Sequence, residues 1–452
     1  MVVLKAELRQ LKPHSILFPA LQSLRQPHQA ITSIHRKHGD LVLGRFFDKN
    51  LLFVSHPEHI EQVYAQEARG LLSRDFLYVA KKSLFGDGLI NSKTETWINQ
   101  RRLLQPLFLK EAVSEWENVI TSNASAAANQ LKKTTPQEIN LSSEIRTLIQ
   151  RIFIQILMGK LVDDMLEKEQ LMDAVGTISK GLLLQMIAQI ISDGKLMKLM
   201  PNKDRQYQTA VAQLYAFVHK EIASRKEQQG HDLISLMLKA TDKKSGYSMT
   251  PELLQDETVN LLFAGQDTTI NTLSWFFYLI GKDAETHKKI TEEILKHKTT
   301  PLTAANLEKL VYTKAALHET LRLYPSSPAL ATQAVADVVI GGYPIPAGTT
   351  ILLSTYVTHR HAALWERPHE FYPEHFLTTP GQEGRHKYSF YPFGGGLHNC
   401  IGRHFVELEM MIVIVTLLRE FTFKTNRAFK EAASITLKPD QDVVLSMNLI
   451  GK

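Results

Sequence analysis

The stretch FGGGLHNCIG, from Phe393 to Gly402, decides the fold of this chain of 452 residues. It holds the chain's one cysteine, Cys400, preceded by three consecutive glycines that begin at Gly394. An apolar run that starts near Phe405 predicts a helix directly after this loop. Glycines permit close approaches that a Cβ atom would block, and the free N–H groups of a helix N-terminus lower the pKa of a nearby thiol. The pattern predicts a thiolate presented on a tight loop to something flat and close.

The single cysteine excludes an internal disulfide, a zinc ribbon and a four-cysteine iron–sulfur site. Cys400 is then an inert buried thiol in a helix-entry turn, a lone metal ligand or a nucleophile. The spacing argues against the inert thiol. With this composition, Phe seven residues before the cysteine, Gly four before and Gly two after would coincide about once in ten thousand chains.

The overall composition indicates a globular protein, with 44% apolar and 22% charged residues and a formal net charge of +6. A small, dispersed basic excess does not indicate nucleic acid, although it would help an acidic partner to dock. The sequence shows no P-loop, GxSxG or HExxH motif. The apolar stretches at residues 17–24, 181–191 and 273–280 are too short to span a membrane. We therefore expect a soluble cytoplasmic protein without a transmembrane anchor.

The hydrophobic pattern predicts a mainly α protein with a small β region, folded as one domain over residues 1–452. The predicted β-rich portion covers about residues 38–56 and 335–360, and it includes a hairpin with a turn at residues 48–50. Short strands are expected near Phe421–Phe423 and Val443–Met447. Helical periodicity appears in four ranges: Leu103–Leu131, Ile145–Met158, Gln206–Ala223 and Thr258–Ile280.

One predicted central helix, NLLFAGQDTTINTLSWFFY from Asn260 to Tyr278, carries polar residues in its apolar middle. Ala264 and Thr268 are four residues apart on one face, so the Thr268 hydroxyl can bond the Ala264 carbonyl and open the helix for water or O₂. Asp267 beside them can carry protons inward. The alternative is a core helix kinked by threonine, with a solvated aspartate.

Two further pairs have helical spacing. Glu319 and Arg322 lie three apart among leucines in LHETLRLYP, and Trp97 and Arg101 lie four apart in ETWINQRR. Each pair has an ordinary interpretation, a surface ion pair in the first case and an amphipathic helix with an extended arginine in the second.

The cysteine stretch resembles the heme loop F-x-x-G-x-x-x-C-x-G of the cytochrome P450 family of heme-thiolate monooxygenases. AGQDTT is similar to that family's oxygen-activation motif. The resemblance implies heme b (iron protoporphyrin IX) between the central helix and the cysteine loop, with Cys400 as the iron ligand. Phe393, Gly394 and Gly402 would shape the loop beside the sulfur, and His398 would face a heme propionate.

The same resemblance implies roles for the other motifs, which follow the family's order along the chain. Asp267 and Thr268 would deliver protons, and Ala264 would lie against the distal face of the heme. Glu319 and Arg322 match an E-x-x-R motif that ties the core to the segment before the cysteine. Trp97 and Arg101 match a W-x-x-x-R helix that binds one propionate.

Two positions depart from the family pattern. His375 stands in PEHF where the family has an arginine, so restoring Arg is expected to keep or increase thermal stability and heme retention. Gln333 stands in ATQAVAD where relatives often have a propionate-binding arginine. We therefore expect one propionate to be held by neutral groups only.

The implied activity is insertion of one oxygen atom of O₂ into an apolar substrate such as a fatty acid, terpenoid or steroid-like molecule. Residues 76–90 and 181–191 are expected to line the substrate pocket. Like soluble bacterial members without a fused reductase, the chain would take electrons from a separate ferredoxin or flavodoxin-type donor. The alternatives are a heme-thiolate isomerase or dehydratase and a non-catalytic heme sensor. The expected donor-docking face contains five basic residues: Arg102, Lys110, Arg385, Lys387 and Arg403.

Overall fold

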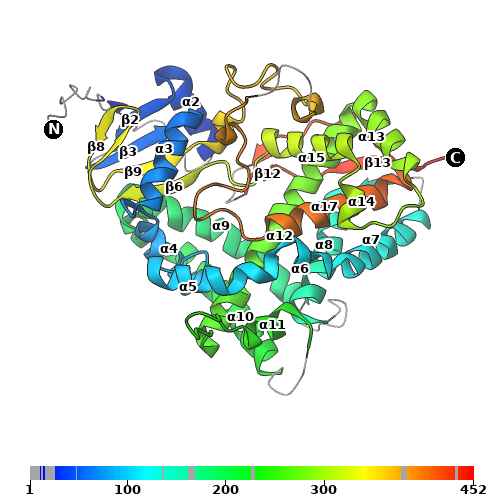
Figure 1. Cartoon of the computed structure of the whole chain (residues 1–452), viewed down its shortest axis with the longest axis horizontal. Helices are drawn as coiled ribbons and strands as arrows, with labels where there is room; N and C mark the ends of the chain where they lie inside the picture. The colour runs from blue at the N-terminus through cyan, green and yellow to red at the C-terminus, as the bar shows by residue number, and fades with distance from the viewer. Residues whose placement is uncertain are drawn as a thin grey trace.

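The computed structural model describes residues 11, 14–15, 26–46, 48–134, 137–160, 168–224, 230–377, 384–432 and 436–451. Figure 1 shows β2, β3, β8 and β9 with helices α2 and α3 on one side of the molecule, and a larger, mostly helical body on the other. The long helix α12 (Pro251–Lys282) runs through this body and packs against α17 (Arg403–Leu418), the helix after the cysteine loop. The predicted class, mainly α with a small β region, is confirmed.

The other described helices surround these two, and short strands make up the rest. The α-helices are α2 (Pro27–His38), α3 (Pro57–Ala68), α4 (Tyr78–Phe85), α5 (Thr94–Leu104), α6 (Lys110–Ser114), α7 (Glu117–Lys132), α8 (Leu141–Met158), α9 (Lys168–Ser192), α10 (Pro201–Ala223), α11 (Leu233–Lys239), α13 (Ala284–Lys296), α14 (Ala304–Leu307), α15 (Val311–Leu323) and α16 (Thr355–Thr358). The 3₁₀ turns are η1 (Asp75–Leu77), η2 (Gln105–Phe108), η4 (Lys195–Leu199), η5 (Pro373–Phe376) and η6 (Lys387–Ser389). The strands are β1 (His14–Ser15), β2 (Leu41–Phe46), β3 (Lys49–Val54), β4 (Leu72–Ser73), β5 (Gln137–Asn140), β6 (Leu330–Ala334), β7 (Val338–Ile340), β8 (Tyr343–Ile345), β9 (Thr350–Leu353), β10 (Phe421–Lys424), β11 (Glu431–Ala432), β12 (Lys438–Pro439) and β13 (Val444–Leu449).

The β-rich side is built on a six-stranded sheet in the order β1-β2-β3-β9-β6-β4. The predicted hairpin is β2–β3, but its register pairs Phe46 with Lys49, so the polar residues at 49 and 50 belong to the strand rather than to the turn. A second hairpin, β7–β8, turns at Gly341 and Gly342, whose φ angles are +59° and +79°. Positive φ at both central positions matches a two-residue turn that fits the twist of the strands.

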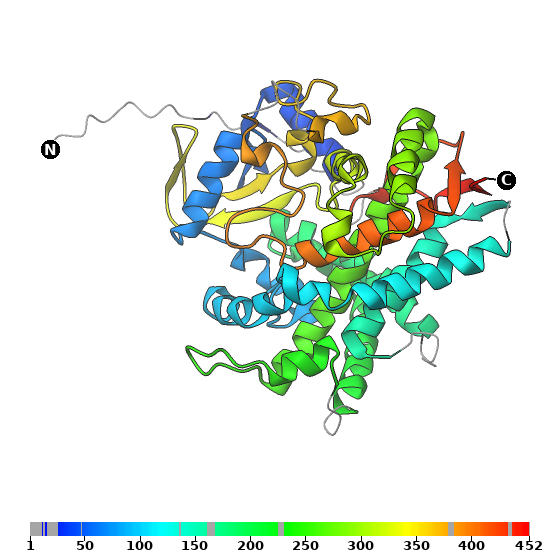
Figure 2. The same ribbon diagram turned by 45° about the vertical axis from the view of Figure 1, so that its right-hand side comes forward.

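The predicted C-terminal strands are present as β10 and β13, which pair antiparallel. β13 also pairs with β5, a strand that the hydrophobic pattern did not indicate. In Figure 2 this small sheet lies at the end of the helical body remote from the large sheet.

The helices follow three of the four predicted ranges, in α8, α10 and α12. The fourth range, residues 103–131, is helical as predicted but is not continuous, because the chain divides into the end of α5, η2, α6 and α7. Pro106 lies inside η2, and a proline lacks the N–H group that would continue the helical hydrogen bonds. α8 ends as predicted at Met158, followed by Gly159 with φ +67°.

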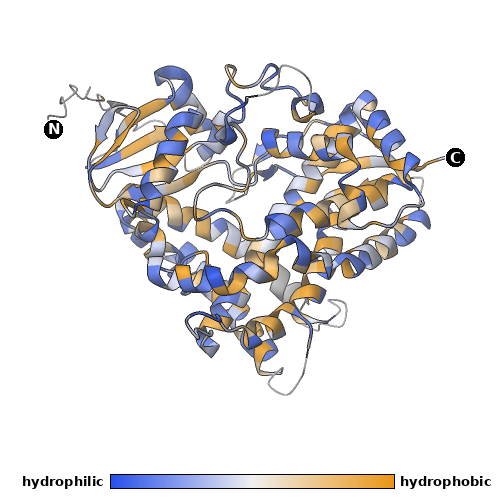
Figure 3. Ribbon diagram, in the orientation of Figure 1, coloured by the Kyte–Doolittle hydropathy of each residue, from blue (hydrophilic) through white to orange (hydrophobic). Residues whose placement is uncertain are grey.

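The centre of the helical body depends on a close contact between α8 and α12. A Cβ atom on Gly265 would lie 2.1 Å from a ring carbon of Phe153, so only glycine lets the two helices pack at this distance. Figure 3 shows hydrophobic residues where the helices pack together and hydrophilic residues along their outer turns. Gly265 therefore has a packing role in the polar middle of α12.

The helix α9 is longer than its most apolar stretch suggested. Residues Ala174–Ser192 are long and apolar enough to cross a membrane, with a mean hydropathy of 1.4, and 28% of that window is buried. We expected residues 181–191 to be too short to span a membrane, but the helix that contains them is long enough. One such helix is weak evidence for a span, because core helices of soluble proteins pass the same test. The apolar stretch at residues 17–24 lies outside the described residues.

Candidate active site

The cysteine loop is closed by its own backbone and held from outside by an aromatic ring. The Cys400 N–H donates to the Phe393 carbonyl at 2.9 Å. Gly394 and Gly396 have φ angles of +71° and +62°, in the left-handed region that favours glycine. A Cβ on Gly396 would lie 2.8 Å from the ring of Tyr64. The glycines thus supply both the turn and the space for close packing.

The Cys400 side chain is partly accessible although its thiol lies among protein atoms. Cys400 has exposed surface, yet the protein packed around it raises the pKa of the thiol by desolvation, against the opposing effects of the Gly402 backbone and Arg101. The predicted lowering of this pKa is therefore wrong for the chain without a ligand, because burial outweighs the helix N-terminus. A Cβ on Gly402 would meet no other protein atom within 4 Å, so the loop leaves open space beside the sulfur.

The middle of α12 presents a second open surface. Ala264 is exposed although its neighbours Leu262 and Phe263 are buried. The Thr268 hydroxyl donates to the Ala264 carbonyl at 3.1 Å, as its spacing predicted. The helix nevertheless stays continuous, so the expected opening is not present. Accessible surface on Ala264 and Cys400, in neighbouring parts of the molecule, fits a flat group bound between them.

Asp267 points to α9 rather than to solvent. Its Oδ2 lies 3.1 Å from the Ser179 hydroxyl, which also lies 3.0 Å from the Val175 carbonyl. Burial raises the pKa of Asp267, while Ser179 and the more distant charges of Lys438 and Arg146 oppose the rise. Asp267 and Thr268 are consecutive residues of α12, so an acid of raised pKa directly precedes the threonine hydroxyl on this helix.

Trp97 and Arg101 from α5 meet the cysteine loop. The Trp97 and His398 rings contact each other with centroids 4.0 Å apart and planes tilted by 42°. Arg101 donates to the Asn399 backbone and side-chain oxygens at 2.8 and 2.6 Å. Burial and the positive charges around His398 lower its pKa to about 3. A buried imidazole beside several cations suits a bound anion.

Glu319 and Arg322 form a buried, bidentate ion pair on α15, with N–O distances of 2.6 and 2.7 Å. His375 Nδ1 lies 3.2 Å from both Glu319 oxygens. Arg322 also donates to carbonyls of the segment that leads to the cysteine loop, those of His359, Pro368 and Glu370. The cluster therefore connects α15 to this segment, with His375 at the position of the expected third partner.

A family model described as Cytochrome P450 matches residues 8–445 of the chain. The chain belongs to the cytochrome P450 family. Cytochrome P450 4V2 of Mus musculus is 27% identical over 418 residues, which cover 86% of this chain and 78% of that protein. Two Streptomyces melanosporofaciens proteins are each 28% identical: cyclooctat-9-en-7-ol 5-monooxygenase over 398 residues (87% and 84%) and cyclooctatin synthase over 407 residues (88% and 86%).

Family membership makes this chain a P450 of monooxygenase type that uses heme, O₂ and a source of electrons. The residues of this chain fit the cofactor. An accessible thiol lies on a glycine loop with open space at Gly402, and the charges of Arg74, Lys81 and Arg101 act on His398 in the same loop.

The P450 sequence motifs did not reveal Ser179 or Lys81. Lys81 follows Leu77 by four residues and precedes Leu84 by three, so the helical period places it on the buried face of α4, and this signal could have identified it. Nothing in the residues around Ser179 pairs it with Asp267, because the two lie on different helices.

Arg385, one of the expected docking residues, is half-buried near the Glu319–Arg322 cluster of this P450. Its guanidinium is 4.1 Å from the centre of the Trp365 ring, and Arg322 lies over the same ring at 4.9 Å. Burial lowers the pKa of Arg385 and the charge of Glu319 opposes the shift. Its contact with this cluster joins residues distant in sequence, and its place in the docking face stays a prediction.

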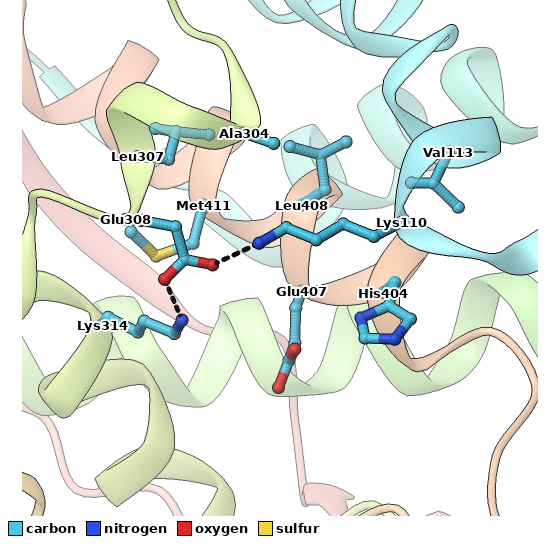
Figure 4. Close-up of a pocket in the computed structure, with 10 residues that line it drawn as sticks. All are labelled: Lys110, Val113, Ala304, Leu307, Glu308, Lys314, His404, Glu407, Leu408 and Met411. Carbon is cyan, nitrogen blue, oxygen red and sulfur yellow. Dashed lines mark hydrogen bonds and ion pairs between the residues drawn. The ribbon is translucent and has the colours of Figure 1, made fainter.

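The remaining basic residues of the expected docking face have acidic partners. In Figure 4 Glu308 lies between Lys110 and Lys314, at 3.3 and 2.5 Å. Their ion pairs reduce the charge that this face offers to an acidic protein. The other three pairs are Arg102–Asp242 at 3.4 Å, Lys387–Glu61 at 2.6 Å and Arg403–Glu407 at 3.4 Å.

The segment after α4, within the predicted pocket lining, is fastened to α12 through its backbone. The N–H groups of residues 87, 89 and 90 donate to Asp256, Glu257 and Asn260 at 2.7, 2.7 and 3.0 Å. Burial raises the pKa of Glu257 to about 8. A Cβ on Gly88 would lie 2.3 Å from the Asn260 amide, so glycine is required there. Because α4 also contacts α9, the two predicted lining segments lie side by side.

Proposed function

We propose that this P450 inserts one oxygen atom of O₂ into an apolar organic substrate. The observation that carries the proposal is the accessible Cys400 thiol, with the open Ala264 face and the Asp267–Thr268 pair on α12. An isomerase or sensor would leave the acid and hydroxyl of α12 without a purpose.

Cys400 would hold the iron of heme b, on the loop shaped by Phe393, Gly394 and Gly402. Trp97, Arg101 and His398 would contact its propionates. When bound, heme activates O₂, and a thiolate ligand favours cleavage of the O–O bond. Glu319, Arg322 and His375 would keep the segment before the loop in place.

Asp267 and Thr268 would handle the protons that the reaction consumes. Burial raises the pKa of Asp267, so its carboxyl keeps a proton to a higher pH than a free aspartate does, beside the Thr268 hydroxyl. The Thr268 hydroxyl donates its hydrogen to the Ala264 carbonyl along α12. The lone pairs of the hydroxyl oxygen therefore stay free to accept a hydrogen bond.

An apolar substrate fits the side chains near α12. The Phe85 and Phe263 rings meet edge to face at 5.4 Å where α4 packs on α12, and α9 brings further apolar side chains alongside. The name of one Streptomyces relative, cyclooctat-9-en-7-ol 5-monooxygenase, specifies an alkenol as substrate and monooxygenation as reaction. We extend this only as far as a fatty acid, terpenoid or steroid-like class.

Electrons would come from a separate acidic ferredoxin or flavodoxin-type protein. The P450 itself would lie in the cytoplasm. The docking surface that the structure favours is a hollow beside the cysteine loop, in which Ile98, Leu109 and Leu397 are 48%, 44% and 53% exposed. Arg101 and Arg102 line the same hollow and supply positive charge. Apolar contact inside a basic rim suits a transient protein partner.

The decisive experiment replaces the thiol. The reduced carbon-monoxide adduct of the wild-type protein should show the red-shifted Soret band of thiolate heme, and Cys400→His should lose that band. Consumption of reductant with O₂ and a substrate that shifts the ferric spectrum separates a monooxygenase from an isomerase or a sensor. An intact band in Cys400→His would refute the assignment of Cys400.

A further inference from the structure

We propose that Lys81 binds the heme propionate that has no arginine at position 333. The inference rests on the heme site proposed above. It replaces the expectation that one propionate meets neutral groups only.

Lys81 is a buried amine that has no counter-ion in the described part of the chain. Its side chain, on the inner face of α4, is 9% exposed, and its Nζ donates to the Ile90 carbonyl at 2.7 Å. In the ranges that the structure describes, no carboxylate reaches it at ion-pair distance, and Asp75 acts on it only from farther away. Burial and the charge of Arg74 lower the pKa of Lys81 to about 7. Such a group is costly unless an anion joins it.

The neighbouring cations show where that anion would lie. The charges of Arg74, Lys81 and Arg101 all act on His398, two residues before Cys400. Arg74 is already paired with Glu67, at 2.8 and 3.4 Å, whereas the Asn399 oxygens bound by Arg101 are neutral. Positive charge therefore exceeds negative charge beside the thiol loop, and two carboxylates on one planar ligand would balance it.

The neutral residue at position 333 lies at the same place in the fold. β6 pairs with β4 so that Gln333 faces Ser73, directly before Arg74. The Gln333 amide donates to the Gly348 carbonyl at 3.3 Å and offers no charge. The cation is thus supplied from α4 rather than from β6.

The test measures loss of heme from the loaded protein to excess apomyoglobin. Lys81→Gln keeps a donor for the Ile90 carbonyl and removes the charge, so heme should leave about tenfold to hundredfold faster, the size of a charge-assisted hydrogen bond. Lys81→Arg should restore slow loss. With heme dimethyl ester, which has no carboxylates, Lys81→Gln and wild type should lose the cofactor equally fast. Lys133→Gln, at an exposed lysine after α7, is the control and should behave as wild type.

Equal acceleration of heme and ester loss in Lys81→Gln would show a structural role and overturn the proposal, as would no acceleration. If Lys81→Gln does not fold, Gln333→Arg in the wild-type background decides. A site that already has its cation should gain less than threefold in retention, and a gain of tenfold or more would show that the carboxylate lacked one. If the wild-type protein lacks the Soret band of thiolate heme, the proposed heme site is refuted, and this outcome is distinct from those that test Lys81.

Discussion

At the scale of single residues, the hydroxyl of Ser179 has one hydrogen and two acceptors within reach. It lies 3.0 Å from the Val175 carbonyl and 3.1 Å from Asp267 Oδ2. Donation from the Ser179 hydroxyl to Asp267 Oδ2 favours the charged carboxylate and so lowers the pKa of the acid. Burial outweighs this effect, and the pKa of Asp267 is raised overall.

Asp267→Asn should therefore change the pH dependence of stability. A carboxyl whose pKa is raised on folding gives stability below its unfolded pKa, about 4, and loses it as the pH rises through the folded value. The asparagine variant should match wild type near pH 4 and melt higher at pH 8. Thermal unfolding of both proteins across this range measures the difference, and a constant difference at all pH values would contradict a raised pKa.

Thr268→Ala should leave heme and substrate binding intact and divert electrons to hydrogen peroxide, because the hydroxyl that passes the proton is lost. Product formed per reductant consumed should fall severalfold, while Thr268→Ser retains most of it. Unchanged coupling in the alanine variant would remove Thr268 from the mechanism.

At the scale of elements, the segment before the cysteine loop is held by polar side chains from three parts of the chain. Glu319 and Arg322 belong to α15, His375 to η5, and Arg385 follows later in the chain. Both arginines lie over the Trp365 ring, Arg322 at 4.9 Å and Arg385 at 4.1 Å from its centre. Arg385 thus brings a permanent cation toward the carboxylate that lost its family arginine.

This arrangement reverses our expectation for His375→Arg. The arginine would replace His375, which is only 3% exposed, so the larger side chain would be crowded. Its guanidinium would also be repelled by those of Arg322 and Arg385. We expect a loss of about 1–3 kcal/mol, the usual cost of overpacking. Chemical denaturation of His375→Arg, with the conservative His375→Gln as comparison, measures it, and a gain in stability would show that the cluster lacks a cation.

Local patterns predicted the elements that carry the motifs, because each motif lies within one turn or one helix. The spacing of Ala264 and Thr268 fixes their shared face, and the glycines before Cys400 fix the turn. The contacts of Lys81, Ser179 and Arg385 were not predicted, since each meets residues distant in sequence and no local period encodes that meeting. The divided range 103–131 shows the converse, in which a helical period continues across the break at Pro106.

At the scale of the whole molecule, the surface next to the thiol combines exposed apolar side chains with charges that are largely paired. Association with an acidic donor should depend on the hollow around Ile98 more than on Lys110, whose charge is shared with Glu308. Long-range attraction toward Arg101 and Arg102 remains and should weaken with salt.

Ile98→Glu should slow reduction by an acidic ferredoxin about tenfold at low salt, because it places a negative charge in the hollow. The wild-type rate should fall with ionic strength and the variant rate should not. Leu199→Glu, at a 78% exposed site in η4, is the control, and dithionite should reduce all three proteins equally. Equal rates with ferredoxin for all three would place the docking surface elsewhere.

The contacts of the cysteine loop also set an order of events during folding. Gly396 packs on Tyr64, and Arg101 reaches Asn399 across 298 positions of sequence. Contacts so remote form only after long stretches of chain have been brought together, and such topologies fold slowly. Emerging from the ribosome, the chain has its first half in place long before the thiol appears. Capture of the cofactor therefore belongs to the last stage of biogenesis, when the two ends of the sequence have met.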